Sequence, residues 1–556
     1  MSFSRQLINN TQAFQEKADI LYDFIKSKND FKKFIKKTAV HLFCSLGYQH
    51  RRAIVVHASK IGFDEAWRSL MKKIEKQSHE VPSYIKIDIV TNKKPVNILS
   101  FINLMTKTKK NYLRFGISFD KDFNYAFLEQ EINGNAMIQF DKDKKRGYLK
   151  EENIQNYIKR HRPDMKQIDF RKVTNVQLFS TKGYFYDGDQ CYKLKEGTLD
   201  NGRRDTPLEA EEIRYMVTSG QTYLNALNQY SGKFNYGYFS CFDKEIKLYD
   251  MLRHASTVYA LIESYEFAPT DETKKVIERS LYFLETDGIY YDGNTRAYMI
   301  DGVDPAKYEI KLSANAAAIL ALTKYTEVFH DDKYLPLAQA LANGIVSLQK
   351  NDGSFVHVLH YPSMDLKENF RTVHYDGKTA FALMRLYKLD GDIEWLTTVE
   401  KAFEYFIGHD YWKHHDHWLS YCANELTYYR SLEKYFKFGL ENTKGKLSFV
   451  YNHETTYPTF LELKLATYHM IARIRETGHT HLLESFNEDQ LLDVIHRRAE
   501  YQRNGFFYPE LAIYYKNPAR IVGSFFIRHH SFRSRIDDVE HNLSGYIAYY
   551  NTFCRS

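Results

Sequence analysis

The sequence holds few cysteines and none of the short motifs that mark the common cofactor and metal folds. Its five cysteines are scattered without a CxxC pair. Their odd number and their scatter do not indicate a disulfide framework. The chain also lacks GxGxxG, a P-loop and HExxH, which are the sequence signatures of dinucleotide, phosphate and zinc-protease sites. We therefore expect no cofactor.

Long apolar segments are missing too. The first residues, MSFSRQLINNTQ, have no apolar signal core. No run approaches the ~18–20 apolar residues of a membrane helix. The sequence thus favours a cytoplasmic protein with reduced cysteines and no membrane span.

Aromatic residues are abundant by contrast, at 15% of the chain with 44 Tyr and 38 Phe. Such rings pack cores, and they also line sugar-binding clefts. The formal net charge is +7, with basic runs at 32–37, 71–76 and 142–147. We interpret these runs as solvated surface and expect no nucleic acid, since no RNA-binding motif accompanies them. A weak preference for anionic substrates or surfaces is the alternative.

From about residue 207 onward, helical patterns come in six pairs. The first member of each pair is amphipathic and the second is rich in small and apolar residues. The second members are LRHASTVYALIESYE, SANAAAILALTKYTEVF, GKTAFALMRLYKL, DHWLSYCANELTYY, TFLELKLATYHMIARIRE and DDVEHNLSGYIAYY. Six such hairpins predict a closed (α/α)6 toroid with the small-residue helices inside, the alternative being an open α-solenoid. Long aromatic loops within the hairpins should lie together where the inner helices begin.

Residues 1–205 differ, because strands such as 51–58, 84–91 and 112–120 alternate with helices. We predict a mainly α protein, in which a smaller α/β domain (1–205) of unknown role precedes the toroid (206–556). The first domain is a candidate docking surface for a protein partner.

Polar clusters precede or open the inner helices and predict a site at the centre of the ring. Inverting glycoside hydrolysis needs two carboxylates, for which we select Asp376 with Asp304, Asp416 or Glu425. Proton abstraction beside a carbonyl suits histidine; the candidates are His254, His374, His417 and His541. We expect substrate contacts from Arg253, His254, Tyr375, Trp418, Arg535 and Asp538, with the two arginines holding an anionic group.

Each of these residues also has a structural interpretation. Asp376, Asp416 and Asp538 stand where a carboxylate caps a helix N-terminus, and a histidine near a helix start is often a hydrogen-bonded core residue. The histidine-rich stretch HDYWKHHDH (409–417) invites a zinc site. It has no HExxH and no evident distant ligand set, so we expect no metal.

Several segments resemble the six-hairpin glycosidase and N-acylglucosamine 2-epimerase superfamily: LRHASTVYALIESYE, HYDGKTAFALMRLYKLDGDIEWL, DHWLSYCANEL and RSRIDDVEHNLSGYIAYY. The resemblance covers about residues 207–556. It implies proton transfer by paired histidines, for which His374 and His541 are the similar positions, or hydrolysis by Asp376 and a second acid. The N-terminal domain belongs to neither pattern.

Together these features predict a cytoplasmic enzyme that acts on a glycan or glycan precursor by hydrolysis or epimerisation. The alternative is a non-catalytic sugar-binding or scaffolding protein in a cell-surface glycan assembly pathway. An isoprenoid- or peptide-cyclising toroid is a more distant alternative, and it predicts an aspartate-rich or Cys/His zinc set that the sequence lacks.

Overall fold

The computed structural model describes residues 2–34, 39–76, 80–162, 165–197, 199–302 and 307–555. The chain forms two compact units. The first comprises Met1–Pro207, Tyr238–Lys244 and Asn504–Ser534, and the second comprises Leu208–Gly237, Glu245–Arg503 and Arg535–Ser556. The short strands β10 (Gly237–Phe239), β11 (Lys244–Glu245) and β17 (Arg533–Arg535) lie at the borders between these segments.

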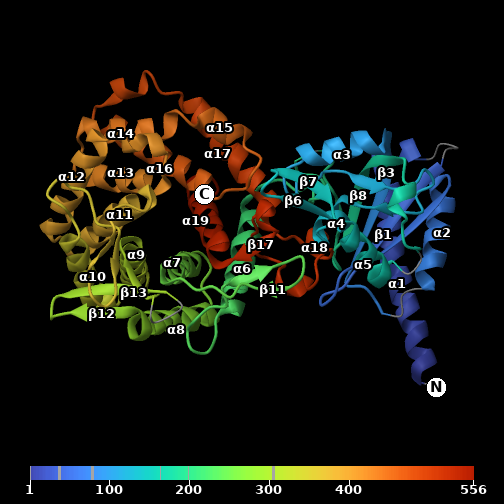
Figure 1. Cartoon of the computed structure of the whole chain (residues 1–556), viewed down its shortest axis with the longest axis horizontal. Helices are drawn as coiled ribbons and strands as arrows, with labels where there is room; N and C mark the ends of the chain where they lie inside the picture. Colours follow the sequence, from blue (N-terminus) through green and yellow to red (C-terminus); the bar gives the residue numbers. More distant parts are fainter. Residues whose placement is uncertain are drawn as a thin grey trace. The chain divides into compact units, whose positions relative to one another are not determined.

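The second unit is a closed ring of helical hairpins (Figure 1). In the described ranges its inner helices are α7 (Met251–Phe267), α9 (Leu312–Phe329), α11 (Val373–Asp390), α13 (His417–Tyr429), α16 (Thr459–Glu476) and α19 (Ile536–Phe553). Their outer partners are α6 (Ala210–Leu227), α8 (Asp271–Gly288), α10 (Leu335–Ser347), α12 (Ile393–Gly408), α14 (Glu433–Lys444) and α17 (Glu488–Gln502). Each inner helix packs against the next, and α19 packs against α7, which closes the ring. The predicted (α/α)6 toroid is therefore confirmed.

The sequence explains which helices lie inside. On α9 every residue from Leu312 to Thr323 is buried, as expected for a helix surrounded on all sides. Gly377 permits a close approach of α11 to α13, because a Cβ there would lie 2.7 Å from Asp416 Oδ1. Three outer helices, α8, α12 and α17, begin at capping residues (Thr270, Asp392 and Asn487) whose side chains accept backbone N–H groups.

The long loops within two hairpins form an antiparallel sheet beside the inner-helix starts. It contains β12 (Ile289–Asp292), β13 (Arg296–Asp301), β14 (Glu309–Lys311), β15 (Val358–His360) and β16 (Leu366–Glu368). The strand β14 runs directly into α9. The predicted carboxylate Asp304 lies outside the described residues. The loop before α16 holds a short helix, α15 (Leu447–Asn452).

The first unit contains an antiparallel sheet with strand order β2-β1-β3-β8-β4-β5, and β9 pairs with β8. Its strands are β1 (Ala39–Gly47), β2 (Ile54–Ile61), β3 (Tyr84–Asn97), β4 (Gly116–Ser118), β5 (Ala126–Phe127), β8 (Asn175–Tyr186) and β9 (Cys191–Lys193), and a separate pair is β6 (Ile138–Asp141) with β7 (Arg146–Leu149). Its helices are α1 (Ser2–Lys26), α2 (Phe63–Glu75), α3 (Ile98–Lys107), α4 (Glu129–Gly134), α5 (Glu151–His161) and α18 (Pro509–Ala512). The predicted combination of strands and helices before the toroid is confirmed.

Part of the aromatic loop in the sixth hairpin belongs to the core of the first unit. Phe507, Tyr515 and Phe526 are buried in one apolar cluster with Phe43 and Phe185 of the sheet. These rings therefore stabilise the first unit, although the long aromatic loops were expected to lie together where the inner helices begin. None of the helices in the described ranges combines the length and apolarity needed to cross a bilayer.

Candidate active site

The toroid encloses a cavity of about 270 Å³, and all of its lining residues lie on the six inner helices. Four are aromatic: Tyr259, Phe381, Trp418 and Tyr421. Acidic and basic groups stand among them, including Glu462, Glu540 and His541. An aromatic cavity with a few charged groups suits a small polar ligand that has apolar faces.

Two of the predicted histidines face each other beside this cavity: His541 lines it, and His417 lies next to its lining residue Trp418. His417 opens α13 and His541 lies in the second turn of α19. Their ring centroids are 5.3 Å apart and the ring planes cross at 80°. Trp418 contacts both rings. The structure thus brings together two histidines from the fourth and sixth inner helices.

His417 is a buried, neutral base. Burial lowers its pKa to about 3, against the opposing charges of Asp416 and Glu462. Its Nδ1 faces the Asp416 carboxylate at 3.6 Å, which places the ring proton on that nitrogen. Among the described residues, no group forms a hydrogen bond with the buried Nε2. The lone pair of this nitrogen is therefore not used by another protein group in the described ranges.

His541 has the opposite charge state. Burial alone would lower its pKa, but the carboxylates of Glu462 and Glu540 raise it to about 9. Nδ1 of His541 donates to Glu462 Oε2 at 3.1 Å, and Nε2 lies 3.5 Å from Glu540 Oε1. His541 is therefore protonated at neutral pH, and a neutral and a protonated imidazole stand in contact at the edge of the cavity.

The two glutamates around His541 differ from each other. Burial raises the pKa of Glu540 to about 7, and Thr257 donates to its Oε2 at 3.0 Å. Burial also disfavours the charged form of Glu462, but His541 and the hydroxyl of Tyr421 lower its pKa below the ordinary value. Sequence analysis overlooked both glutamates. The available signal was a glutamate in the first two turns of an inner helix.

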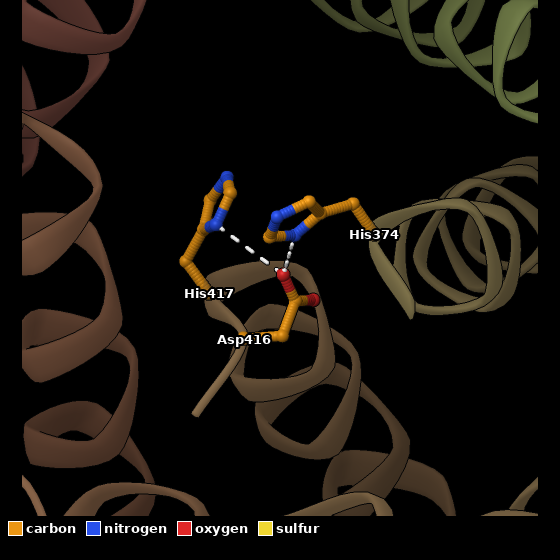
Figure 2. A group of neighbouring side chains, drawn as sticks. All are labelled: His374, Asp416 and His417. Carbon is orange, nitrogen blue, oxygen red and sulfur yellow. Dashed lines mark hydrogen bonds and ion pairs between the residues drawn. The ribbon is translucent and has the colours of Figure 1, made fainter. Parts of the chain in front are cut away.

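Asp416 connects His417 to His374 of α11 (Figure 2). One carboxylate oxygen accepts from Leu419 N at 3.0 Å and caps α13, as the structural interpretation proposed. The other oxygen lies between the two imidazoles and is hydrogen-bonded to His374 Nδ1. This bond raises the pKa of His374, whose side chain is exposed. His374 thus lies beside the pair rather than within the cavity lining.

Lys378 is a further charged group at this site that sequence analysis overlooked. It is buried, donates to Ser256 Oγ at 3.1 Å and lies 4.4 Å from the ring centre of Trp418. Burial lowers its pKa. Lys378 follows His374 by four residues and therefore occupies the same face of α11. This spacing is the sequence signal that could have identified Lys378.

Asp376 occupies a different environment from the histidine pair. It is buried, and its Oδ1 lies 3.1 Å from Nε2 of His357. Burial raises the pKa of Asp376. The rings of Tyr375 and His357 stack at 5.3 Å, and His357 Nδ1 accepts from Arg371 N. Asp376 and Tyr375 thus hold the loop that precedes α11, outside the cavity lining.

The two predicted arginines are neutralised by neighbours. Arg253 donates to Asp537 at 2.8 Å and to Asp250 at 2.9 Å, and Arg535 forms an ion pair with Asp537. Asp538 accepts from the backbone N–H of Arg535 and caps α19. These residues form an ion-pair network at the starts of α7 and α19.

His254 and Glu425 interact with partners away from the histidine pair. Both ring nitrogens of His254 are hydrogen-bonded, to Tyr249 OH at 2.7 Å and to the carbonyl of Ser280 at 2.9 Å. Glu425 lies near the C-terminal end of α13, 3.5 Å from Arg385. The structure places neither of them with the histidine pair.

Among the described residues, two groups of side chains have the composition of a metal site. They are His374, Asp416 and His417, and His417, Glu462 and His541, each with its ligand atoms within 4.8 Å of one another. Two imidazoles and a carboxylate are donors that divalent transition metals accept. In the second group, His541 would have to lose its proton to bind a metal. The expected absence of a metal stays a prediction.

No protein-family model matches this chain, and no curated protein matches its sequence. Among solved structures, the chain is similar to a cellobiose 2-epimerase from Bacillus thermoamylovorans, with 11% identity over 62% of this chain and 99% of the other, and a TM-score of 0.48. A D-mannose isomerase gives 9% identity, coverage of 63% and 100%, and a TM-score of 0.47. A GH76 α-mannanase from Bacteroides thetaiotaomicron is 11% identical over 61% of this chain and 87% of the other, with a TM-score of 0.31. Because these TM-scores lie below 0.5, we infer the chemistry of this chain from its own residues alone.

Proposed function

We propose that this protein is a carbohydrate-active enzyme that moves a proton at a carbon beside a sugar carbonyl, as in epimerisation or aldose–ketose isomerisation. The observation that carries the proposal is the contact between neutral His417 and protonated His541. Aromatic rings around the pair, including Trp418 and Tyr421, supply flat faces for a sugar ring.

The reaction follows from the charge states. His417 Nε2 takes the proton, the C–H bond breaks, and its electron pair moves into the carbonyl to form an enediolate. The positive charge of His541 and the amine of Lys378 stand where they would stabilise the new oxyanion. Return of a proton from His541 to the opposite face gives the epimer, and return of the proton held by His417 to the neighbouring carbon gives the isomer.

Hydrolysis is the second candidate, and the two glutamates favour it. Glu540, with its pKa raised to about 7, would protonate the leaving oxygen, and Glu462 would act as the base toward water. This assignment replaces Asp376, which lies outside the cavity lining. A location in the cytoplasm, a role in a glycan pathway and a protein partner for the first unit stay predictions from the sequence.

Proton NMR in D2O with a panel of hexoses, N-acyl hexosamines and oligosaccharides separates these functions. Deuterium entering the sugar at C2 supports proton transfer. A new reducing-end anomeric signal without deuterium incorporation supports hydrolysis instead. Saturable sugar binding without any turnover favours the non-catalytic alternative. Replacing His469 by Asn is the control, because it changes a histidine that lines the cavity and is hydrogen-bonded to Thr552.

A further inference from the structure

The first unit contains a cavity of about 420 Å³ whose charged lining is positive. Arg51, Arg52, Arg160 and Lys516 line it, and no carboxylate does so among the described residues. They come from the β1–β2 turn, from α5 and from the segment Asn504–Ser534. The volume lies within the range of about 300–1,000 Å³ that small-molecule sites occupy.

One face of α5 supplies much of the wall. Asn153, Asn156, Tyr157, Arg160 and His161 all line the cavity. Their spacing of three, four, seven and eight residues places them on one side of a helix. Tyr157 is buried toward the core of the unit, whereas Asn156 and Arg160 are exposed. The helix therefore presents amide and guanidinium donors along one line.

Arg52 gives the cavity a buried positive charge. It is 7% exposed and donates to the carbonyls of Gly134 (2.8 Å), Tyr514 (2.6 Å) and Cys241. Within the described ranges, no carboxylate lies at ion-pair distance from it. Burying a guanidinium without a counter-charge is costly, and burial lowers its pKa. An anion in the cavity would offset this cost.

Other donors at the cavity are available to a ligand. In the part of the chain that the structure describes, the side chains of Arg160, Lys516 and Asn156 form no hydrogen bond or ion pair. Arg51 binds Glu80 at 2.7 Å on the surface. Phe242 also lines the cavity with 52% of its surface exposed, which leaves its ring open for stacking.

The helix dipole explains only part of this arrangement. Cations are favoured in the last turn of a helix, which accounts for Lys159, Arg160 and His161 at the end of α5. It does not account for Arg52 or Lys516, which belong to other elements. Convergence of cations from separate segments on one cavity indicates a ligand of opposite charge.

We propose that this cavity binds a small phosphorylated ligand with a planar ring, of the nucleoside diphosphate class. The phosphates would contact Arg160, Lys516 and Asn156 above the buried charge of Arg52. Guanidinium groups bind phosphate oxygens through paired, charge-assisted hydrogen bonds. The base would stack on Phe242. This site is independent of the function proposed for the toroid.

Isothermal titration of the full chain at fixed ionic strength tests the proposal. The probes are ADP, UDP, pyrophosphate and uncharged adenosine. We expect saturable binding of a nucleoside diphosphate, and affinity lower by about tenfold or more in Arg160→Ala, equivalent to about 1.4 kcal/mol. Lys516→Ala should weaken binding as well. Lys159→Ala is the matched control, since it removes an equal charge from the same turn but does not line the cavity.

Phe242→Ala separates the two parts of the ligand, because it should weaken ADP or UDP and leave pyrophosphate unchanged. Equal binding of pyrophosphate and the nucleotides, unaffected by Phe242→Ala, would overturn the nucleoside assignment. Equal losses in Lys159→Ala and Arg160→Ala would show unspecific charge attraction and overturn the site. Absence of saturable binding for every charged probe would do the same.

Discussion

Glu462 Oε2 accepts a hydrogen bond from His541 Nδ1 at 3.1 Å, and Tyr421 OH donates to the other oxygen of the same carboxylate at 3.2 Å. The three groups lie on three different inner helices. This contact holds the proton on His541, because the negative charge of Glu462 is the largest contribution that raises its pKa. The charge state of the proposed acid therefore depends on a second side chain.

Replacing Glu462 by Gln should shift the alkaline limit of activity to lower pH. The raised pKa keeps His541 protonated up to about pH 9. Without the carboxylate, the proton leaves closer to the ordinary value of 6.5, so activity at pH 8 falls more than activity at pH 6. The pH profile of kcat/KM measures this shift. Tyr421→Phe keeps the charge and should leave the limit in place, and an unchanged limit in Glu462→Gln would show that His541 is not the acid.

Replacing His417 by Asn should abolish most of the turnover without unfolding the toroid. A general base contributes about 10²–10⁴-fold to a rate, and the substitution removes the free Nε2 while keeping a polar side chain. The measurement is kcat together with deuterium incorporation from D2O. His469→Asn should keep near-normal activity. Equal losses in the two variants would place the base elsewhere.

Replacing Gly377 by Ala should disturb the start of α13. The new Cβ would lie 2.7 Å from Asp416 Oδ1 and 2.8 Å from Leu419 N, so the cap of α13 and the neighbouring His417 must shift. Overpacking of this kind costs about 1–3 kcal/mol, which denaturant unfolding would measure. Gly545→Ala, on α19, is the control, because its nearest neighbour is 3.6 Å away. We expect that variant to be neutral or stabilised by up to about 1 kcal/mol.

Local pattern was sufficient to predict the ring but not the partners of individual side chains. The small-residue run of α9 identifies an inner helix because helix burial leaves a periodic local signal. The pairing of Glu462 with His541 has no such signal, since the residues lie 79 positions apart. Asp376 and Asp416 look alike in sequence, each near a helix start. Only the folded structure places one beside His357 and the other beside His374.

The sixth-hairpin loop shows the same limit in the first unit. The long aromatic loops were expected to lie together where the inner helices begin, and Phe507 and Phe526 belong to one of them. Their burial against Phe43 depends on contacts between segments more than 400 residues apart.

Replacing Glu510 by Gln should destabilise the first unit specifically. Glu510 is fully buried, and its carboxylate accepts from the Arg204 backbone and guanidinium at 2.9–3.1 Å. Removing one charge of a buried pair costs about 3–5 kcal/mol. Hydrogen exchange should therefore rise across β3 and β8 and stay unchanged in α9 and α11. Glu65→Gln, which breaks an exposed pair with Arg68, should cost less than about 1 kcal/mol. Equal, small losses in the free energy of unfolding in both variants would contradict this prediction. The Arg204–Glu510 pair would then not hold the segment Asn504–Ser534 to Met1–Pro207 in the first unit.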